Sequence, residues 1–339
     1  MGHLAGKEIY KQLGKKIDGL TVRAPWNSTF HEILKILYTA EEAAFLIKMP
    51  FGFSSFEKIQ QISGYSESAL KKLLHSLCSK GLVMDIKMRR SYRYTISPMV
   101  IGIFEYTMMR IGGNTDLKKI SKLFHQYMIE DPSFYQANFD DRKNVSMTRT
   151  IPHDGVIDDD ITEVLDYEKA ESVIKQAKKY AIGTCSCRHE MLHLDKKECN
   201  HPLESCVSFG LAADFLIRNK LAREATETEI LENLARSKES GLALSGDNVS
   251  KNISFICHCC GCCCHLMLGI SQTGYPGTVV SSNYIAEIND NLCTGCGKCA
   301  KACPIKAIEM KPDTNQLNKK KRHPVINLDI CLGCGVCAL

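Results

Sequence analysis

The stretch that decides the fold lies near the C-terminal end of the chain and reads Cys293-Thr294-Gly295-Cys296-Gly297-Lys298-Cys299-Ala300-Lys301-Ala302-Cys303-Pro304. Its cysteines follow the spacing C-x2-C-x2-C-x3-C, and a proline comes directly after the last one. Three sulfurs this close in sequence can surround one iron–sulfur cluster if the loop turns tightly, which the two glycines permit. The fourth cysteine then points toward a second cluster. The stretch therefore predicts ligands for two clusters.

A second cysteine run supports this interpretation. Cys331, Cys334 and Cys337 alternate with glycines after a spacer long enough for one β-hairpin. Residues 283–339 thus resemble the bacterial ferredoxins that carry two [4Fe-4S] clusters. The resemblance implies a crossed arrangement, in which this run binds one cluster together with Cys303. A structural zinc site is disfavoured, because zinc sites use two CxxC pairs instead of three evenly spaced cysteines before a Cys-Pro.

The same resemblance assigns Cys293, Cys296 and Cys299 to the other cluster, with a late fourth cysteine expected at about position 341. The sequence ends at Leu339. We expect that the sequence is a fragment of a longer protein. The alternative is a cluster with three protein thiolates, which leaves one iron open to an exogenous ligand or gives a three-iron cluster.

The composition is that of a soluble, cytoplasmic protein with two or three domains. The chain has 339 residues, 43 basic against 38 acidic side chains, and a net charge of +5, too small a surplus to indicate a general polyanion-binding surface. We expect no signal peptide and no membrane span, since no long apolar segment occurs. The 18 cysteines then indicate metal ligands instead of disulfides.

Residues 29–98 are expected to form a winged-helix-like domain, after a polar arm at residues 1–28. Thr39 interrupts an apolar helical pattern and precedes two glutamates, so we expect two helices there, the second capped by Thr39. Further on, the patterns predict a helix, a second helix and a two-stranded hairpin, at residues 56–62, 67–80, 82–88 and 92–96. This order resembles the winged-helix domains of bacterial and archaeal regulators.

Basic side chains on this domain raise the question of DNA binding. They are Lys71, Lys72, His75, Lys80, Lys87, Arg89, Arg90 and Arg93. Their charges suffice for several phosphate contacts if they share one face. The second helix, however, offers no exposed Asn, Gln or Arg for bidentate base contacts. Protein docking is therefore favoured over DNA binding.

A helical connector with an acidic linker is expected at residues 99–165, followed by a helical cysteine-rich domain at residues 166–282. Helices are predicted at residues 166–182, 207–219 and 226–238. Ten cysteines fall in this domain: Cys185, Cys187, Cys199, Cys206, Cys257, Cys259, Cys260, Cys262, Cys263 and Cys264. They cluster with Gly and His without a helical or strand period, so metal binding is the best explanation.

The ten thiols allow more than one arrangement. We expect at least one [4Fe-4S] cluster, with the simplest ligand set being Cys185, Cys187, Cys199 and Cys206. The run at residues 257–264 either holds a second cluster or supplies ligands to the first. One cluster and one zinc ion with histidine ligands is the alternative. Arg188 either donates hydrogen bonds to cluster sulfurs or lies at the surface.

The expected architecture is thus α+β and multi-domain. Nearly the whole chain is similar to the multi-domain 4Fe-4S ferredoxin-type proteins of anaerobic bacteria and archaea, which implies iron–sulfur electron transfer with a redox partner protein. No motif for a nucleotide, a flavin or a nucleophilic serine occurs. We therefore favour a non-catalytic electron-transfer subunit. The alternatives are a redox- or iron-sensing winged-helix regulator and an enzyme with an open-coordinate cluster.

Overall fold

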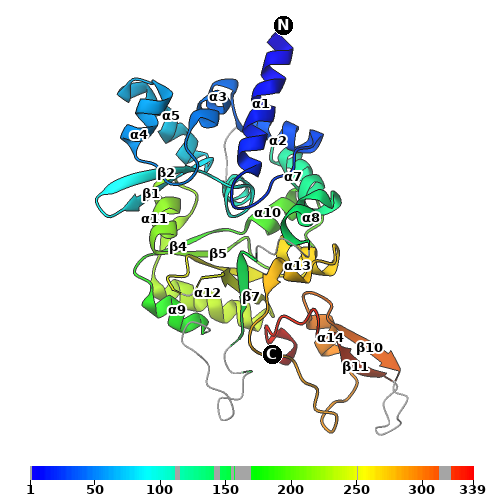
Figure 1. Cartoon of the computed structure of the whole chain (residues 1–339). Coiled ribbons are helices and arrows are strands. Elements are labelled where there is room, and N and C mark those ends of the chain that lie inside the picture. Colours follow the sequence, from blue (N-terminus) through cyan, green and yellow to red (C-terminus); the bar gives the residue numbers. More distant parts are fainter. Residues whose placement is uncertain are drawn as a thin grey trace.

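The computed structural model describes residues 2–110, 115–140, 146–153, 156, 169–249, 251–312 and 322–339. Figure 1 shows the N-terminal helices (blue and cyan) above a central sheet (green and yellow), with the C-terminal segment (orange and red) beside the lower end of that sheet. The acidic stretch at residues 158–160, expected as a linker, lies outside the described residues. Among the described residues, no helix has both the length and the apolar character needed to cross a bilayer.

Helices form the N-terminal core. Residues 1–28, expected as a polar arm, contain helix α1, whose Leu13 and Ile17 are fully buried. The predicted break at Thr39 is confirmed, because Thr39 and Glu42 form a capping box at the start of the following helix. The helices are α1 (Gly2–Asp18), α2 (Ser28–Leu37) and α3 (Ala40–Lys48).

The next elements are two helices and a hairpin, in the expected order: α4 (Phe56–Ser63), α5 (Glu67–Ser79), β1 (Val83–Met88) and β2 (Ser91–Ile96). Two of the charged groups on this unit have structural partners. The Lys80 ammonium lies 2.6 Å from the carboxylate of buried Glu42. The Asp85 carboxylate on β1 lies 2.5 Å from Arg218, so the hairpin is joined to the central domain. Assignment of this unit as a winged helix stays a prediction.

The connector is helical and belongs to the N-terminal core. Its elements are η1 (Met99–Ile103), α6 (Phe104–Met109), α7 (Leu117–His125), η2 (Gln126–Glu130) and α8 (Ser133–Phe139). Phe104, Phe124 and Tyr127 pack in the same apolar cluster as the first helices. The connector therefore places one side of the N-terminal core against the central sheet.

The central domain was expected to be helical. Instead, it is built on a seven-stranded sheet with the order β6-β4-β5-β8-β7-β3-β9. Predicted helices at residues 166–182 and 207–219 are partly wrong, since both contain strands. The helix predicted at residues 226–238 is confirmed as α12. The strands are β3 (Thr148–Ile151), β4 (Tyr180–Thr184), β5 (Glu204–Phe209), β6 (Arg223–Ala225), β7 (Ala243–Asp247), β8 (Phe255–Cys259) and β9 (Val279–Val280).

The two faces of this sheet differ because side chains alternate along a strand. Ile182, Val207 and Ile256 are paired in register and point to one face, where they pack against α9 and α12. Their sequence neighbours Cys206 and Cys257 point to the other face, toward the connector. The helices of this domain are α9 (Ala170–Gln176), α10 (Ser186–His193), α11 (Gly210–Arg218), α12 (Glu227–Glu239) and α13 (His265–Ser271), with η4 (Pro276–Thr278).

We call residues 283–339 the tail. Its regular elements are α14 (Lys298–Ala302), the antiparallel pair β10 (Ile308–Pro312) and β11 (Arg322–Ile326), and η5 (Val336–Ala338). The two cysteine runs lie in turns, where Gly295, Gly297, Gly333 and Gly335 have positive φ angles between 61° and 80°. Only glycine adopts this conformation without strain, so these residues allow the tight turns.

Candidate metal centre

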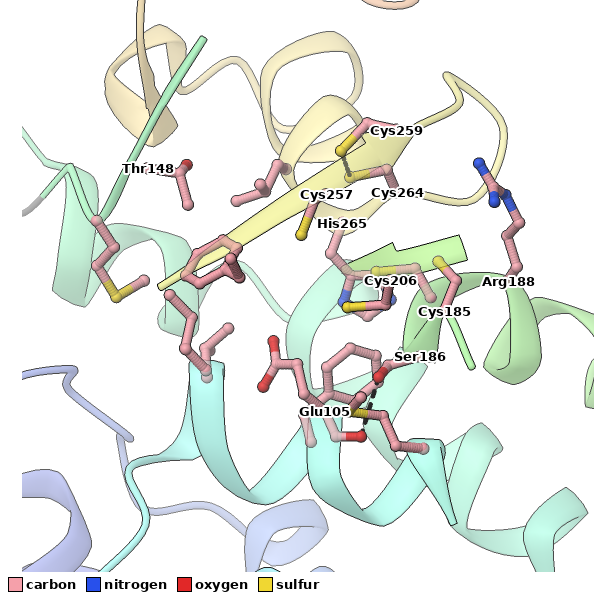
Figure 2. Close-up of a pocket in the computed structure, with 18 of the residues that line it drawn as sticks. Glu105, Thr148, Cys185, Ser186, Arg188, Cys206, Cys257, Cys259, Cys264 and His265 are labelled. Carbon is pink, nitrogen blue, oxygen red and sulfur yellow. Dashed lines mark hydrogen bonds between the residues drawn. The ribbon is translucent and has the colours of Figure 1, made fainter. Parts of the chain in front are cut away.

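Seven cysteines line one chamber between the central sheet and the connector. Cys260 also belongs to a second thiol group, and the other six are called the chamber thiols. The strand-to-helix junction after β4 supplies two of them, β5 one, β8 two, and the residue that caps α13 the last. They are Cys185, Cys187, Cys206, Cys257, Cys259 and Cys264. The chamber has a volume of about 170 Å³ and is otherwise walled mainly by apolar side chains of α6, α8 and α11. Figure 2 shows the sulfur atoms of Cys185, Cys206 and Cys257 around the space that Glu105 faces from the opposite wall.

The chamber thiols are near enough to affect one another. The Sγ atoms of Cys259 and Cys264 are 3.2 Å apart. A hydrogen bond with Cys206 is the largest of several causes that raise the pKa of Cys257. A hydrogen bond from Cys187 is the largest cause that lowers the pKa of Cys264. The set can therefore hold thiolate charge, which is the form that binds metals.

A buried guanidinium lies beside these thiols. Arg188 on α10 has no solvent exposure, which excludes the alternative that it lies at the surface. It donates hydrogen bonds to the Ser205 hydroxyl at 2.6 Å and to the His258 carbonyl at 2.5 Å. Burial lowers its pKa, but nearby thiolates, first Cys185 and then Cys260, leave that pKa raised. Because a buried cation needs an anionic partner, the thiolates provide the opposite charge.

A second group of thiols lies next to the chamber. The Sγ atoms of Cys199, Cys260, Cys262 and Cys263 all lie within 4.8 Å of one another. The structure thus groups Cys199 with the residue 260–263 turn. The simplest ligand set of Cys185, Cys187, Cys199 and Cys206 stays a prediction, and the geometry favours other partners for Cys199. Hydrogen bonding from Cys263 is the largest cause that lowers the pKa of Cys260 to about 4.

Three further buried side chains, His125, Glu190 and His265, lie close together next to the chamber. Sequence reasoning did not single out His125 or Glu190. His265 donates or accepts a hydrogen bond with Glu190 at 2.5 Å, and His125 contacts the Lys196 ammonium at 3.0 Å. Two ligands of one tetrahedral zinc lie about 3.3 Å apart if each bond is about 2.0 Å. The shorter His265–Glu190 distance is therefore that of a hydrogen-bonded pair, which fixes the start of α13 against α10.

Glu105 on α6 is the carboxyl group that borders the chamber, and it accepts a hydrogen bond from the Gly102 N–H at 2.9 Å. Burial raises the pKa of Glu105 from 4.5 to about 7. A carboxyl group whose pKa is higher in the folded state stabilises the fold only while it is protonated. Its contribution is thus complete below pH 4.5 and lost as the pH rises to about 7.

We therefore expect Glu105→Gln to be more stable than the wild type above pH 7, by up to about 3 kcal/mol. The difference should shrink as the pH falls toward 4.5. Anaerobic urea unfolding of both proteins across this pH range measures it. A difference independent of pH would show that Glu105 is not held in an environment that favours its neutral form.

In the tail, the structure brings Cys303 to the second cysteine run. Burial, with the neighbouring thiolate charges of Cys303, Cys337 and Cys331, raises the pKa of Cys334 to about 12. Backbone groups also point at tail sulfurs: the Ala307 N–H donates to Cys303 Sγ at 3.2 Å, and the Gly295 N–H to Cys293 Sγ at 3.4 Å. Such donors stabilise cluster-bound thiolates. The donor set and the turns therefore fit iron–sulfur clusters.

Comparison with known families agrees with this geometry. Residues 292–339 match the 4Fe-4S dicluster domain. The tail is thus of the 4Fe-4S ferredoxin type, and the match supports [4Fe-4S] clusters as the groups it binds. No curated protein and no solved structure matches the chain.

The dicluster tail packs directly against the chamber. Cys259 and Cys264 of the chamber lie in one apolar cluster with Ile305, Leu332 and Val336 of the tail, and Cys303 and Cys334 pack against that cluster. Gly261 permits the approach, because a Cβ atom there would lie 2.5 Å from the Pro304 carbonyl oxygen. The His153 N–H also donates to the Cys334 carbonyl at 3.2 Å. The chamber and the tail thiols therefore border one apolar interface.

Proposed function

We propose that the protein carries single electrons through iron–sulfur clusters, between a partner oxidoreductase that docks on the tail and a cluster site in the chamber. The observation that carries this proposal is the shared apolar cluster, which contains Cys259 and Cys264 and against which Cys303 and Cys334 pack. Electron transfer between two protein-bound clusters needs them close together. An apolar cluster that both sets of ligands border meets that need.

The proposed ligands are the two cysteine runs of the tail and the chamber thiols. One tail cluster takes Cys293, Cys296 and Cys299, and the other takes Cys303 with Cys331, Cys334 and Cys337. A further [4Fe-4S] cluster takes four of the six chamber thiols: Cys185, Cys187, Cys206, Cys257, Cys259 and Cys264. When bound, such clusters supply one-electron transfer, at potentials that proteins tune between about −700 and +450 mV.

The proposed clusters form a series with one end at the protein surface, in the tail, and the other end buried, in the chamber. Cys296 is exposed, and Leu292, the residue before Cys293, has 77% of its surface exposed. This end of the tail is where we propose that the partner docks. At the other end, apolar side chains enclose the chamber and Arg188 balances thiolate charge. The arrangement supports transfer between the surface and a site protected from water.

The N-terminal domain supports the chamber. The Ser186 hydroxyl, between two chamber cysteines, donates to the Glu105 carbonyl at 2.9 Å. Tyr135 on α8 donates to the His265 carbonyl at 2.8 Å. These bonds join the connector to both helices that carry chamber thiols, so we propose a scaffolding role for this domain, with docking favoured over DNA binding.

Iron analysis tests the ligand assignment. We expect replacement of Cys185, Cys206 and Cys257 together by serine to remove about four irons and four sulfides per chain. The change takes one thiol from each of three parts of the chamber wall, namely the junction after β4, β5 and β8. Electron paramagnetic resonance signals of the tail should persist. The matched control is Cys78→Ser, which changes a buried cysteine in the N-terminal core. An unchanged iron content in the triple variant would exclude a chamber cluster.

A further inference from the structure

The four thiols outside the chamber set are spaced for a single metal ion. Cys260 Sγ lies 3.8 Å from Cys199 Sγ and 3.7 Å from Cys262 Sγ, and the sulfurs of Cys262 and Cys263 are 3.5 Å apart. Zinc binds thiolates at about 2.3 Å, so the sulfurs of a tetrahedral site are about 3.8 Å apart. The observed spacings agree with the edges of that tetrahedron. A cubane has four metal corners, and its thiolates lie farther apart.

The four thiols come from two separate segments of the chain. Cys260, Cys262 and Cys263 lie in the turn between β8 and α13, whereas Cys199 lies in the segment between α10 and β5. Among the described residues, no hydrogen bond between backbone atoms joins the two segments at Cys199. A shared metal ion would connect them, as closed four-thiolate sites do in small folds.

The surroundings favour a closed structural site over an open one. Cys263 is fully buried and Cys260 is 7% exposed. Apolar side chains pack around the group, namely Met191, Leu242 and Leu268. Two cationic groups lie close by. The Lys197 ammonium donates a hydrogen bond to the Cys199 carbonyl, and the charge of Arg188 helps to lower the pKa of the Cys260 thiol. Their charges would balance the net negative charge of four thiolates on one divalent cation.

We propose that Cys199, Cys260, Cys262 and Cys263 bind one Zn²⁺ in a closed tetrahedral site. This site is separate from the chamber cluster of the proposed function, although Cys260 also borders the chamber. Its role is structural. It holds the turn that contains Gly261, against which Pro304 of the tail packs, and so supports the interface between chamber and tail.

Metal analysis of the full chain tests the proposal. The wild type, purified without added metal, should contain about one zinc per chain, and its X-ray absorption at the zinc edge should show four sulfur neighbours at about 2.3 Å. The double variant Cys199→Ser with Cys262→Ser should lose this zinc and keep its iron and acid-labile sulfide. The control variant Cys78→Ser should keep its zinc, iron and acid-labile sulfide. In the wild type, a strong chelator should remove zinc while iron and sulfide stay.

The contrary outcomes are distinct. Loss of about four irons with sulfide in the double variant would overturn the zinc site and assign these thiols to a cluster. Iron without sulfide, bound by four sulfurs, would also overturn it. A wild type free of zinc after purification in the presence of zinc would do the same. None of these results contradicts electron transfer, which depends on the iron held by the chamber and the tail. If the double variant does not fold, the absorption spectrum and the chelator result decide.

Discussion

Replacement of Gly261 by alanine is expected to separate the tail from the chamber and to abolish magnetic coupling between their reduced clusters. The added Cβ would lie 2.5 Å from the Pro304 carbonyl oxygen and 3.0 Å from its Cα. Both are backbone atoms, so no side chain can rotate to relieve the clash. Overpacking of this kind costs about 1–3 kcal/mol, which weakens docking by roughly 5- to 150-fold. Electron paramagnetic resonance of the fully reduced protein measures the coupling.

A control in the same chain separates the clash from the loss of a glycine. At Gly19 a Cβ would have its nearest neighbours at 3.4 Å, an ordinary contact. Gly19→Ala should therefore leave the coupling unchanged. Iron, sulfide and zinc are counted in both variants, because Gly261 lies between proposed zinc ligands. Unaltered coupling in a Gly261→Ala protein with full metal content would show that the interface does not determine the distance between the clusters.

Replacement of Arg188 by methionine is expected to lower the reduction potential of the chamber cluster by about 100 mV. Reduction adds a negative charge, which a nearby guanidinium stabilises. A unit charge at about 6 Å, in a medium with an effective dielectric constant of about 20, contributes about 3 kcal/mol. For a one-electron couple this is roughly 120 mV. An anaerobic redox titration followed by electron paramagnetic resonance gives the potential.

Two comparisons support the interpretation of that shift. Arg188→Lys keeps the charge but loses the paired donors to Ser205 and His258, so its potential should fall by less. The tail clusters, whose ligands do not contact Arg188 in the described structure, serve as an internal reference. If Arg188→Met leaves the chamber potential unchanged, the guanidinium does not balance the charge of the cluster ligands.

Local patterns predicted the turns of the tail and the helix break at Thr39, but they missed helix α1, which lies in the expected polar arm. In the tail, the cysteine spacing and four glycines define the turns by themselves, and the family match supports the clusters. In the N-terminal part, Thr39 and Glu42 form the predicted capping box because capping depends on a few consecutive residues. Such signals are contained in short segments, and the rest of the fold does not override them.

The central sheet could not be recognised in the same way. Strands β4, β5 and β8 are short, and their chamber face carries Gly, Cys and Ser instead of the polar residues of a solvated face. The apolar face alone, with Ile182 and Val207, fits a helical period about as well as a strand. Short apolar runs are ambiguous between the two. Helices were therefore predicted where strands carry the metal ligands.

The grouping of the ten central cysteines depends on topology instead of spacing. Strand β8 runs between β5 and β7, which brings Cys257 to Cys206 and carries the following turn to Cys199. These contacts join residues 51 or more positions apart, and no local pattern indicates them. Arg188 and Glu190 were equally hard to assign, because a buried charged residue is recognised only when its partner is known.

The most direct test of the account is a count of iron and acid-labile sulfide, combined with an anaerobic redox titration followed by electron paramagnetic resonance. We predict about twelve irons and twelve sulfides per chain, three cubanes' worth. The electron paramagnetic resonance signals should be reversible and should show magnetic coupling between the chamber cluster and the tail clusters. About eight irons, all of them lost when the tail cysteines are replaced, would contradict the account. The chamber would then hold no cluster, and the protein would not carry electrons beyond its tail.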